Sequence, residues 1–389
     1  MGLPGAWRSI SPYQNLINPG SCKVLEGRRP CSPYSCGLSM VLLLVTGTCI
    51  FLCVTDRSLL SEQWGQVSRE WSGPNPAAPT APSQNTEPHT EPHVDVHTEV
   101  HAKFQWEAPG PYHVAYPRSY IFTLDEPDAC REEDPFLVLI VPVAAKNLLA
   151  RGAIRRTWGN ESLVLGKTVR LFFLLGLPSG KGSERLQADV EKEREEHRDL
   201  LQSNFLDSYR NLTIKTMMML EWVASRCRNA SYAMKVDSDV FLNVQNLVKM
   251  LLDPKTPRQD YITGMVTRHS VVVRNPNSKW YMPVDVYPDA TYPPYPLGMG
   301  YVFSTDLPQK LVDVSRRIRP LYIEDVHIAM CLKQLGIVPT DPPSRSLFKA
   351  YMPSRFNRCH YASVITTILD GPARLLQYWS DLQKPAPPC

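Results

Sequence analysis

Short apolar runs alternate with longer amphipathic stretches through the last two thirds of the chain. Four runs are rich in β-branched and aromatic residues and predict buried strands, at residues 135–143, 169–176, 232–236 and 261–266. Four stretches predict helices, at residues 147–158, 183–197, 213–226 and 324–335. Strands that alternate with helices in this way predict an α/β fold, with a mostly parallel sheet and helices on both faces.

A long uncharged run interrupts the polar N-terminal part of the chain. Residues 37–54 carry no charge and are just long enough to cross a bilayer as a helix. A cleaved signal peptide is disfavoured because the run starts late and lacks a small-residue cleavage signature. A buried core helix is disfavoured because polar, proline-rich chain follows. Since residues 1–36 carry four basic residues and one acid, we expect a type II membrane protein with a cytosolic tail, a signal-anchor at 37–54 and a luminal remainder.

Residues 55–128 lack a sustained apolar pattern and predict a luminal stem. Residues 72–88 are rich in Pro, Ala, Thr and Ser, as extended linkers are. Histidines recur every fourth residue from His89 to His101, but two prolines oppose the helix that a zinc site would need. Residues 129–389 then form one domain, and a formal net charge of +4 argues against nucleic acid as the main partner.

Two carboxylates stand where a predicted strand stops. Residues 232–236 are followed at once by Asp237-Ser238-Asp239, and side chains two apart in extended chain point the same way. Ligands collect beyond the carboxyl ends of the strands in open α/β sheets. Neighbouring carboxylates stay ionised most easily beside a cation, and oxygen ligands suit Mg²⁺ or Mn²⁺ shared with a phosphate. We therefore expect a metal–diphosphate site here, although such a tripeptide alone also occurs in solvated loops.

A luminal domain is open to glycosylation and to disulfide formation. The predicted N-glycosylation sites are Asn160, Asn211 and Asn229. In an oxidising lumen we expect the disulfides Cys130–Cys227 and Cys331–Cys359, with Cys389 free or intermolecular. Spacing alone does not determine this connectivity.

Eight segments carry a further signal when they are taken together and in order. They are Arg151–Gly159, Phe173–Gly176, Asp207–Thr216, Lys235–Asn243, Lys279–Tyr281, Tyr292–Tyr295, Gly298–Val302 and Glu324–Val326. As a set they resemble the β-1,3-galactosyltransferase family, and most closely its members that transfer galactose to N-acetylglucosamine. The resemblance covers residues 130 to about 380.

The resemblance implies a GT-A fold and an inverting transferase in the Golgi membrane. The donor would be UDP-galactose, the cofactor Mn²⁺, and the acceptor a glycan of a glycoprotein or glycolipid that ends in N-acetylglucosamine. A homodimer is left open.

The resemblance also assigns roles to residues. The metal is assigned to Asp239, helped by Asp237. The donor is assigned to these two residues and to Arg151, Arg155, Asp207 and Lys215. The acceptor is assigned to Trp280, Tyr281, Tyr295, Gly298 and Gly300. Catalysis is assigned to Asp325 as general base and to Glu324 as a contact to acceptor or donor.

Residue chemistry alone leaves simpler alternatives open. The two arginines, four apart on a helix, could form surface salt bridges, and Asp207 and Lys215 could pair structurally. The two neighbouring aromatic residues could pack in the core, and the two glycines could mark a plain turn. Two acids at the start of a helix also complement its dipole.

The chain departs from the family at two places. Pro296, Leu297 and Met299 replace a Cys, a Ser and a Thr that commonly stand between the tyrosines and glycines of this segment. A His that the family tends to carry nine residues after its last core cysteine, and that is thought to bind the metal, corresponds to Ile368. We therefore keep two alternatives: an N-acetylglucosaminyl or N-acetylgalactosaminyl transferase, and a catalytically silent glycan-binding or chaperone homologue.

Overall fold

The computed structural model describes residues 110–131, 134–351, 353, 355–385, 387 and 389. The predicted cytosolic tail, the signal-anchor at 37–54 and residues 55–109 of the predicted stem, which include His89 to His101, lie outside these residues. Within the described part of the chain, no helix is long and apolar enough to cross a membrane. All described residues belong to one compact unit, Phe104–Cys389.

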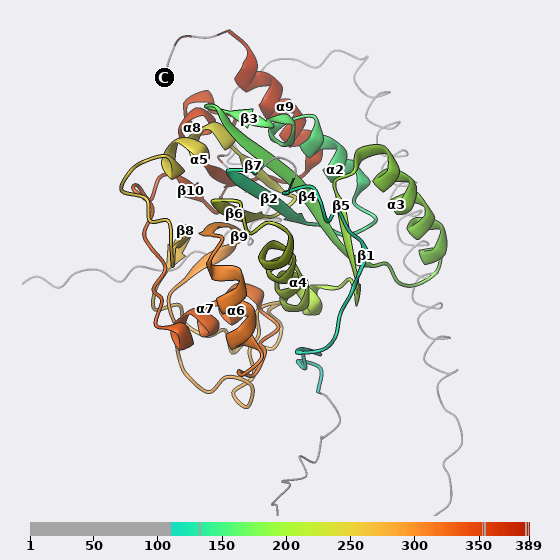
Figure 1. Cartoon of the computed structure of the whole chain (residues 1–389). Helices are drawn as coiled ribbons and strands as arrows, with labels where there is room; N and C mark the ends of the chain where they lie inside the picture. The colour runs from blue at the N-terminus through green and yellow to red at the C-terminus, as the bar shows by residue number, and fades with distance from the viewer. Residues whose placement is uncertain (1–109, 132–133, 352, 354, 386, 388) are drawn as a thin grey trace, which may run out of the picture. The chain divides into compact units, whose positions relative to one another are not determined.

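A mixed sheet organises this unit, in the order β1-β5-β4-β2-β6-β9-β8 (Figure 1). Its four central strands run parallel: β5 (Leu200–Leu206), β4 (Lys167–Leu177), β2 (Leu137–Pro142) and β6 (Tyr232–Val236). The outer strands run antiparallel: β1 (Phe122–Leu124), β9 (Tyr295–Ser304) and β8 (Ile262–Thr267). The prediction of a mostly parallel sheet is therefore wrong outside the centre. Parallel neighbours need a crossover, usually a helix, and no α-helix lies between β8 and β9.

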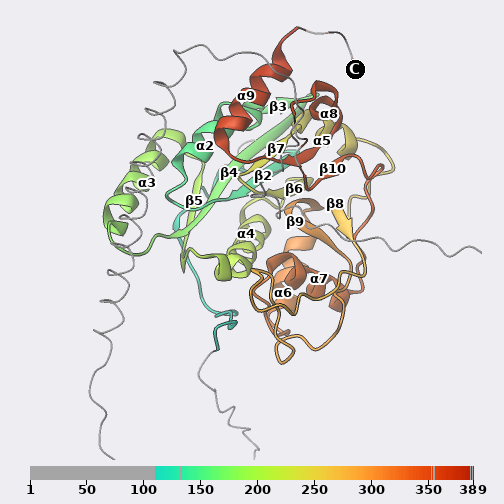
Figure 2. The same cartoon turned by 180° about the vertical axis from the view of Figure 1, so that it is seen from behind.

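Helices cover both faces of the sheet, as predicted. One face packs against α4 (Leu212–Arg226), α6 (Leu307–Ser315) and α7 (Glu324–Leu335). The other packs against α2 (Leu148–Arg155), α5 (Val244–Leu251) and α9 (Pro372–Gln383). The two views show α6 and α7 at the lower end and α2 and α9 at the upper end (Figures 1 and 2). Residues of β2 alternate between the two cores, as side chains of a strand must.

The remaining elements complete the unit. They are β3 (Leu163–Val164), β7 (Val240–Leu242), β10 (Phe348–Lys349), β11 (Thr366–Ile368), α3 (Ser183–His197), α8 (Arg358–Ser363) and two 3-10 turns, Trp158–Asn160 and Tyr209–Asn211. The order β10-β11-β7 forms a second small sheet. This sheet brings the C-terminal part of the chain back beside the turn that follows β6.

The folded unit begins earlier than the predicted domain boundary at residue 129. Strand β1 pairs with β5, and Val114 is buried in one of the two cores. The error arose because a three-residue strand, and single apolar residues before it, carry no detectable periodicity.

The disulfides agree only in part with the expected pairs. Cys130 and Cys227 are joined, as expected. The expected Cys331–Cys359 pair is wrong, because Cys359 is joined to Cys389 and Cys331 is a buried free thiol. Cys331 lies on α7, packed in the core of one sheet face, whereas Cys359 lies on α8, whose Tyr361 packs in the core of the opposite face.

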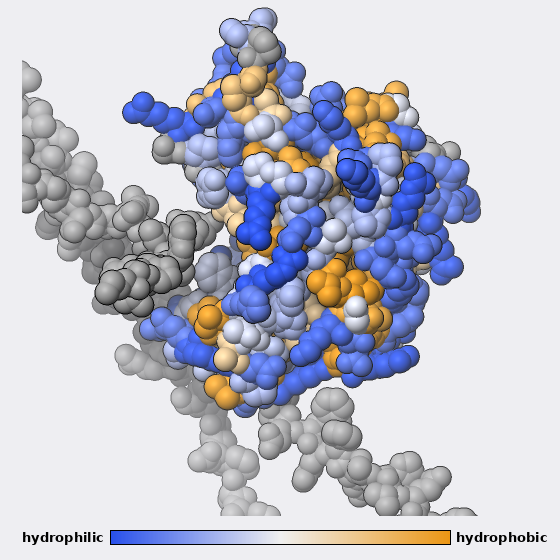
Figure 3. Space-filling view, turned by 90° about the vertical axis from the view of Figure 1, so that its left-hand side faces the viewer, coloured by the Kyte–Doolittle hydropathy of each residue, from blue (hydrophilic) through white to orange (hydrophobic). Residues whose placement is uncertain are grey.

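The surface carries the predicted glycosylation sites and scattered apolar residues. Asn160 and Asn229 are exposed, and Asn211 is half-buried with its amide donating to Leu206 O at 2.8 Å. On the face drawn in Figure 3, apolar residues form several separate patches among polar ones. That face therefore offers no continuous apolar surface.

Candidate active site

A buried lysine in the central strand β6 gathers the acidic groups of the site. Lys235 is only 5% exposed, and its ammonium lies 2.7 Å from Asp237 Oδ1 and 3.1 Å from Glu324 Oε1. It also donates to Gly298 O. Burial favours the neutral amine, but the two carboxylate charges outweigh it and hold the pKa of Lys235 above its ordinary value. Lys235 was not predicted to be a site residue. A charged residue within a buried, otherwise apolar strand indicates a buried partner of opposite charge, so the sequence did contain evidence for its role.

Two adjacent carboxylates at the start of α7 have different surroundings. Glu324 is 6% exposed and accepts hydrogen bonds from Tyr301 and Thr216, each at 3.2 Å. Burial, opposed by Lys235, raises the pKa of Glu324 to about 7. Asp325 is only half-buried and accepts from Gly298 N at 2.8 Å. Burial raises its pKa as well, and the Gly298 hydrogen bond opposes that rise.

Strand β9 lies against these carboxylates through a glycine. A Cβ added at Gly298 would lie 2.6 Å from Glu324 Oε1 and 3.2 Å from Asp325 Oδ2, so a side chain does not fit. Gly300, two residues on, packs against Met234 and Lys235 of β6. Both glycines lie within a strand, so the plain turn considered for them is wrong.

The predicted metal-binding aspartates follow β6 directly. Asp237 is 39% exposed and Asp239 is exposed. Although the residue as a whole is exposed, partial desolvation of its carboxylate and then the charge of Asp237 raise the pKa of Asp239, and a nearby cation would lower that pKa again. Among the described residues, no group of three or more His, Cys, Asp or Glu side chains surrounds a metal site. The two aspartates therefore fit a cation only if other ligands, such as donor phosphates, complete its shell.

The position where the family carries a His lies next to this pair. Ile368 of β11 is paired with Val240 of β7, and Leu369 N donates to Asp239 O at 2.7 Å. An isoleucine there supplies no metal ligand.

Asp207 and Lys215 contact one another at the same edge of the sheet. Lys215 is buried, and its ammonium lies 2.8 Å from Asp207 Oδ2 and 3.0 Å from Val143 O. Asp207 also accepts from Gly176 N at 3.1 Å. Burial lowers the pKa of Lys215, although Asp207 opposes this. The pair therefore joins the ends of β2, β4 and α4.

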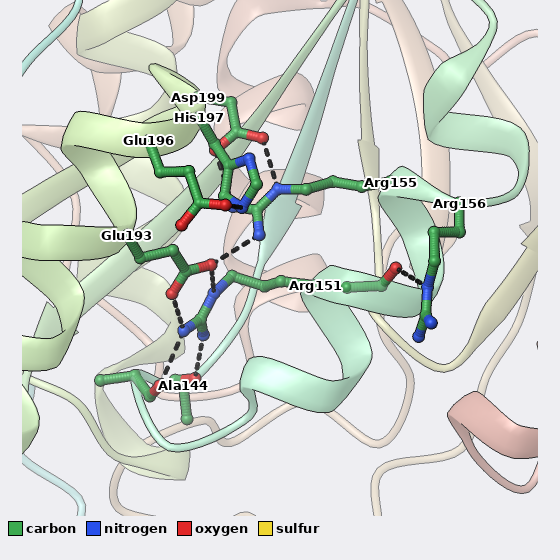
Figure 4. A network of polar contacts seen from close by, with 10 residues as sticks. Ala144, Arg151, Arg155, Arg156, Glu193, Glu196, His197 and Asp199 are labelled. Carbon is green, nitrogen blue, oxygen red and sulfur yellow. Dashed lines mark hydrogen bonds and ion pairs between the residues drawn. The ribbon is translucent and has the colours of Figure 1, made fainter.

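Arg151 and Arg155 do not lie at the acidic site. Arg151 is 1% exposed and forms a two-bond ion pair with Glu193 of α3, at 2.8 and 2.5 Å (Figure 4). Arg155 binds Asp199 at 2.7 and 2.8 Å and also pairs with Glu193 at 2.7 Å. Both guanidiniums are therefore engaged by carboxylates of the protein, in a network that is more buried than the surface pair considered for them. Direct binding of the donor by these arginines stays a prediction.

Aromatic side chains border the exposed side of the carboxylates. Tyr295 is buried, and burial followed by the charge of Asp325 raises its pKa. Burial followed by the charge of Asp325 also raises the pKa of Tyr209 to about 12, so this residue, which sequence reasoning did not single out, lies at the site too. Trp280 is 38% exposed beneath the Lys279 ammonium, which lies 4.6 Å from its ring centroid. Tyr281 instead packs edge-on against Tyr112 at 5.6 Å.

A cavity of about 440 Å³ adjoins this border one turn along α7. Its wall includes Ala329, four residues after Asp325, and Lys333, four residues after that. Tyr292 lines it as well and contacts Tyr295 with ring centroids 6.4 Å apart.

A family model and two similar proteins carry galactosyltransferase in their names. A model of the galactosyltransferase family matches residues 149–343. Beta-1,3-galactosyltransferase 2 of Homo sapiens is 43% identical over 274 residues, which cover 70% of this chain and 64% of that protein. Beta-1,3-galactosyltransferase 1 of Mus musculus is 40% identical over 267 residues, which cover 68% of this chain and 79% of that protein.

Solved structures give weaker likenesses. Galactosyltransferase LgtC with donor and acceptor sugar analogs has a TM-score of 0.32 at 12% identity, over 64% of this chain and 97% of that chain. The bifunctional glycosyltransferase WbbM has a TM-score of 0.35 at 13% identity, over 61% of this chain and 46% of that chain. Neither structure is similar enough to support a conclusion about this chain. The family model and the two relatives that are at least 40% identical show that the chain belongs to the β-1,3-galactosyltransferase family.

Proposed function

We propose that this protein is an inverting β-1,3-galactosyltransferase that moves galactose from UDP-galactose to glycans ending in N-acetylglucosamine, on glycoproteins or glycolipids. The names of its relatives support galactose as the transferred sugar and the β-1,3 linkage. The observation that supports chemistry in this chain most directly is the contact of Lys235 with both Asp237 and Glu324. That contact joins the expected donor side of the site to Glu324, the neighbour of the expected base Asp325.

Of the two neighbouring carboxylates, Asp325 is a better candidate for the general base than Glu324. It is half-buried and accepts from backbone N–H groups of Gly298 and Val326, which leaves lone pairs for a substrate. Its carboxylate would take the proton of the acceptor hydroxyl while that oxygen bonds to the anomeric carbon and the bond from that carbon to UDP breaks. Glu324, held by three side chains, would instead keep Lys235 in place.

Asp239 and Asp237 would hold Mn²⁺ together with phosphate oxygens of the donor. When bound, the ion supplies charge neutralisation for the departing UDP. Because Ile368 adds no ligand, we expect the affinity for the metal to be lower than in relatives that carry a His there. A GT-A fold, which the family implies, is compatible with the parallel central strands and the acidic edge.

The acceptor side departs from the family pattern at Pro296, Leu297 and Met299. Gly298 and Tyr295 lie beside Asp325, and the cavity along α7 offers room for acceptor beyond the reacting sugar. Trp280 would contact the acceptor from its half-exposed position. Because these three substitutions lie on the acceptor side, we expect them to change which acceptor is used and to leave the choice of donor unchanged.

We also propose that the protein is a type II protein of the Golgi membrane with this unit in the lumen. The uncharged run at 37–54 and the three sequons support this placement. The two disulfides support it as well, since they form in oxidising compartments.

A UDP-release assay on the full-length protein tests the function. The expected result is turnover with UDP-galactose, Mn²⁺ and a β-N-acetylglucosaminide acceptor. Preference for UDP-N-acetylglucosamine or UDP-N-acetylgalactosamine would favour the alternative transferases. Binding of UDP without turnover on any acceptor would favour the silent homologue.

A further inference from the structure

Three consecutive carbonyl oxygens after β2 are held by buried cations. Val143 O accepts from Lys215 Nζ, Ala144 O from Arg151 Nη1 and Ala145 O from Arg151 Nη2, each at 3.0 Å. Ala144 O also accepts from Asn147 N at 2.9 Å, which closes a turn over residues 144–147. Two side chains from opposite faces of the sheet thus fix one short segment (Figure 4 shows the Arg151 half).

The Arg151 guanidinium uses most of its N–H groups in these contacts. Its Nε and Nη2 bind Glu193, and its Nη1 and Nη2 bind the two alanine carbonyls. Four of the five N–H groups that a guanidinium has are therefore used. Glu193 in turn is held ionised: although its burial favours the neutral acid, its hydrogen bonds to Arg151 outweigh this and lower its pKa.

The turn lies at the acidic edge of the sheet. Strands β2 and β6 are parallel neighbours with Ile140 opposite Lys235, so the segment after β2 and the Asp237 segment leave the sheet at the same edge. The charge of Asp237 also acts on Lys215, which holds the first of the three carbonyls.

Fixing the carbonyls also fixes the N–H groups that follow them. In a trans peptide the C=O and the next N–H point in opposite directions, so the N–H groups of Ala144, Ala145 and Lys146 face away from the cations. No described residue accepts a hydrogen bond from any of the three. Ala145 is nevertheless 3% exposed, and buried backbone N–H groups normally have a partner.

We propose that Arg151 is a positioning residue that presents these backbone N–H groups to oxygen atoms of the donor's nucleotide. The proposal rests on the proposed function, since a nucleotide-sugar is the ligand that brings such oxygens to this edge. It assigns Arg151 an indirect role: the guanidinium touches the turn and the turn touches the nucleotide.

The test measures UDP binding to the full-length protein by calorimetry, with Arg151→Lys as the variant. A lysine keeps a cation for Glu193 but cannot reach both carbonyls and the carboxylate. We expect the dissociation constant of UDP to rise at least about tenfold, and KM for UDP-galactose to rise more than kcat falls. Hydrogen exchange at residues 144–146 should slow on adding UDP in the wild type and slow less in the variant.

Two controls separate positioning from general stability. Asp199→Asn weakens the same ion network at Arg155 without touching the turn, and Arg156→Lys changes an exposed arginine bound to Gly152 O. Both should leave UDP affinity unchanged. An equal loss of affinity in Arg151→Lys and Asp199→Asn, or no loss in Arg151→Lys, would overturn the proposal.

A second variant, Ala145→Pro, tests the proposal even if Arg151→Lys fails to fold. Ala145→Pro deletes one of the N–H groups at the second position of the turn, where proline is favoured. It should weaken UDP binding about tenfold while the thermal midpoint stays near that of the wild type. Wild-type affinity in this variant would contradict the proposal. A wild type that binds UDP but transfers no galactose would contradict the proposed function alone.

Discussion

At the residue scale, the neighbouring carboxylates Glu324 and Asp325 of α7 have different surroundings. Glu324 is enclosed by Lys235, Tyr301 and Thr216, whereas Asp325 is half-buried with two backbone N–H donors. Environments that differ in this way separate the roles of paired acids. Asp325 is the one that a hydroxyl can reach.

Replacing Asp325 by Asn should remove turnover and keep the fold. Asn preserves the hydrogen bond from Gly298 N but cannot accept the proton, so kcat should fall by roughly 10²- to 10⁴-fold. UDP affinity should not change. UDP release and calorimetry measure the two quantities, and full turnover in Asp325→Asn would exclude this residue as the base.

The raised pKa of Glu324 predicts a pH dependence of stability. Its folded pKa of about 7 lies above the ordinary 4.5, so the folded state holds the proton more tightly than the unfolded state does. The free energy of unfolding therefore falls as pH rises from 4.5 to 7, by up to about 3 kcal/mol in total.

Glu324→Gln does not titrate and isolates this effect. Urea unfolding of the wild type and the variant at pH 5 and pH 8 should show the wild type losing stability relative to the variant at the higher pH. A constant difference between the two proteins would mean that Glu324 does not titrate in this range.

Gly298 should tolerate no side chain. Its Cβ in Gly298→Ala would lie 2.6 Å from Glu324 Oε1, and Lys235, Tyr301 and Thr216 hold this buried carboxylate in place. We expect kcat/KM to fall by about 10²-fold through displacement of the carboxylates. Gly152→Ala is the matched control, because its nearest neighbour would be 4.0 Å away and alanine favours a helix. Equal activity of the two variants would show that the close approach at Gly298 is unimportant.

At the element scale, the short strand β11 brings a distant segment to the metal-binding aspartates. It pairs with β7, which directly follows Asp239, and places Ile368 opposite Val240. The register explains how a residue more than a hundred positions later bears on the acidic site.

Ile368→His should strengthen Mn²⁺ binding. Position 368 lies one residue from Asp239 across this strand pair, and Ile368 is only partly buried against the core. An imidazole that turns from the core toward Asp239 would add a ligand, so the affinity for Mn²⁺ in the presence of UDP should rise about tenfold, equivalent to about 1.4 kcal/mol. Ile368→Val controls for packing. A calorimetric titration that gives the same affinity for all three proteins would show that this position does not reach the metal.

Hydrophobic periodicity predicted some helices and strands and missed others. Helices at 183–197 and 324–335 and the strand at 232–236 match the prediction at both ends. Strand β9 was not predicted, because Pro296, Gly298 and Gly300 interrupt its apolar pattern. Those same residues let it approach the carboxylates, so the feature that hid the strand is the one that serves the site.

At the scale of the whole molecule, the two cores decide which cysteines meet. Cys331 is buried beside His327 on one face of the sheet, and Cys359 lies on α8, which packs on the other. No local feature of the sequence carries that information.

Alkylation of the denatured, unreduced protein should therefore label only Cys331 among the five cysteines after residue 129. Peptide mapping identifies the labelled residue. In Cys227→Ser, Cys130 should be labelled as well, and stability should fall by about 4 kcal/mol because the lost bridge spans 97 residues. Label on Cys359 or Cys389 in the wild type would contradict the second bridge.

The sequence by itself determined the alternation of elements, the acidic pair at the end of a central strand and the family. These depend on local periodicity and on short segments of adjacent residues. Tertiary structure alone decided that Lys235 joins both acidic pairs, that Arg151 holds the carbonyls of a turn, and that Cys359 meets Cys389. Each of those contacts joins segments that only folding brings together, because a side chain's partner is set by packing and not by its neighbours along the chain.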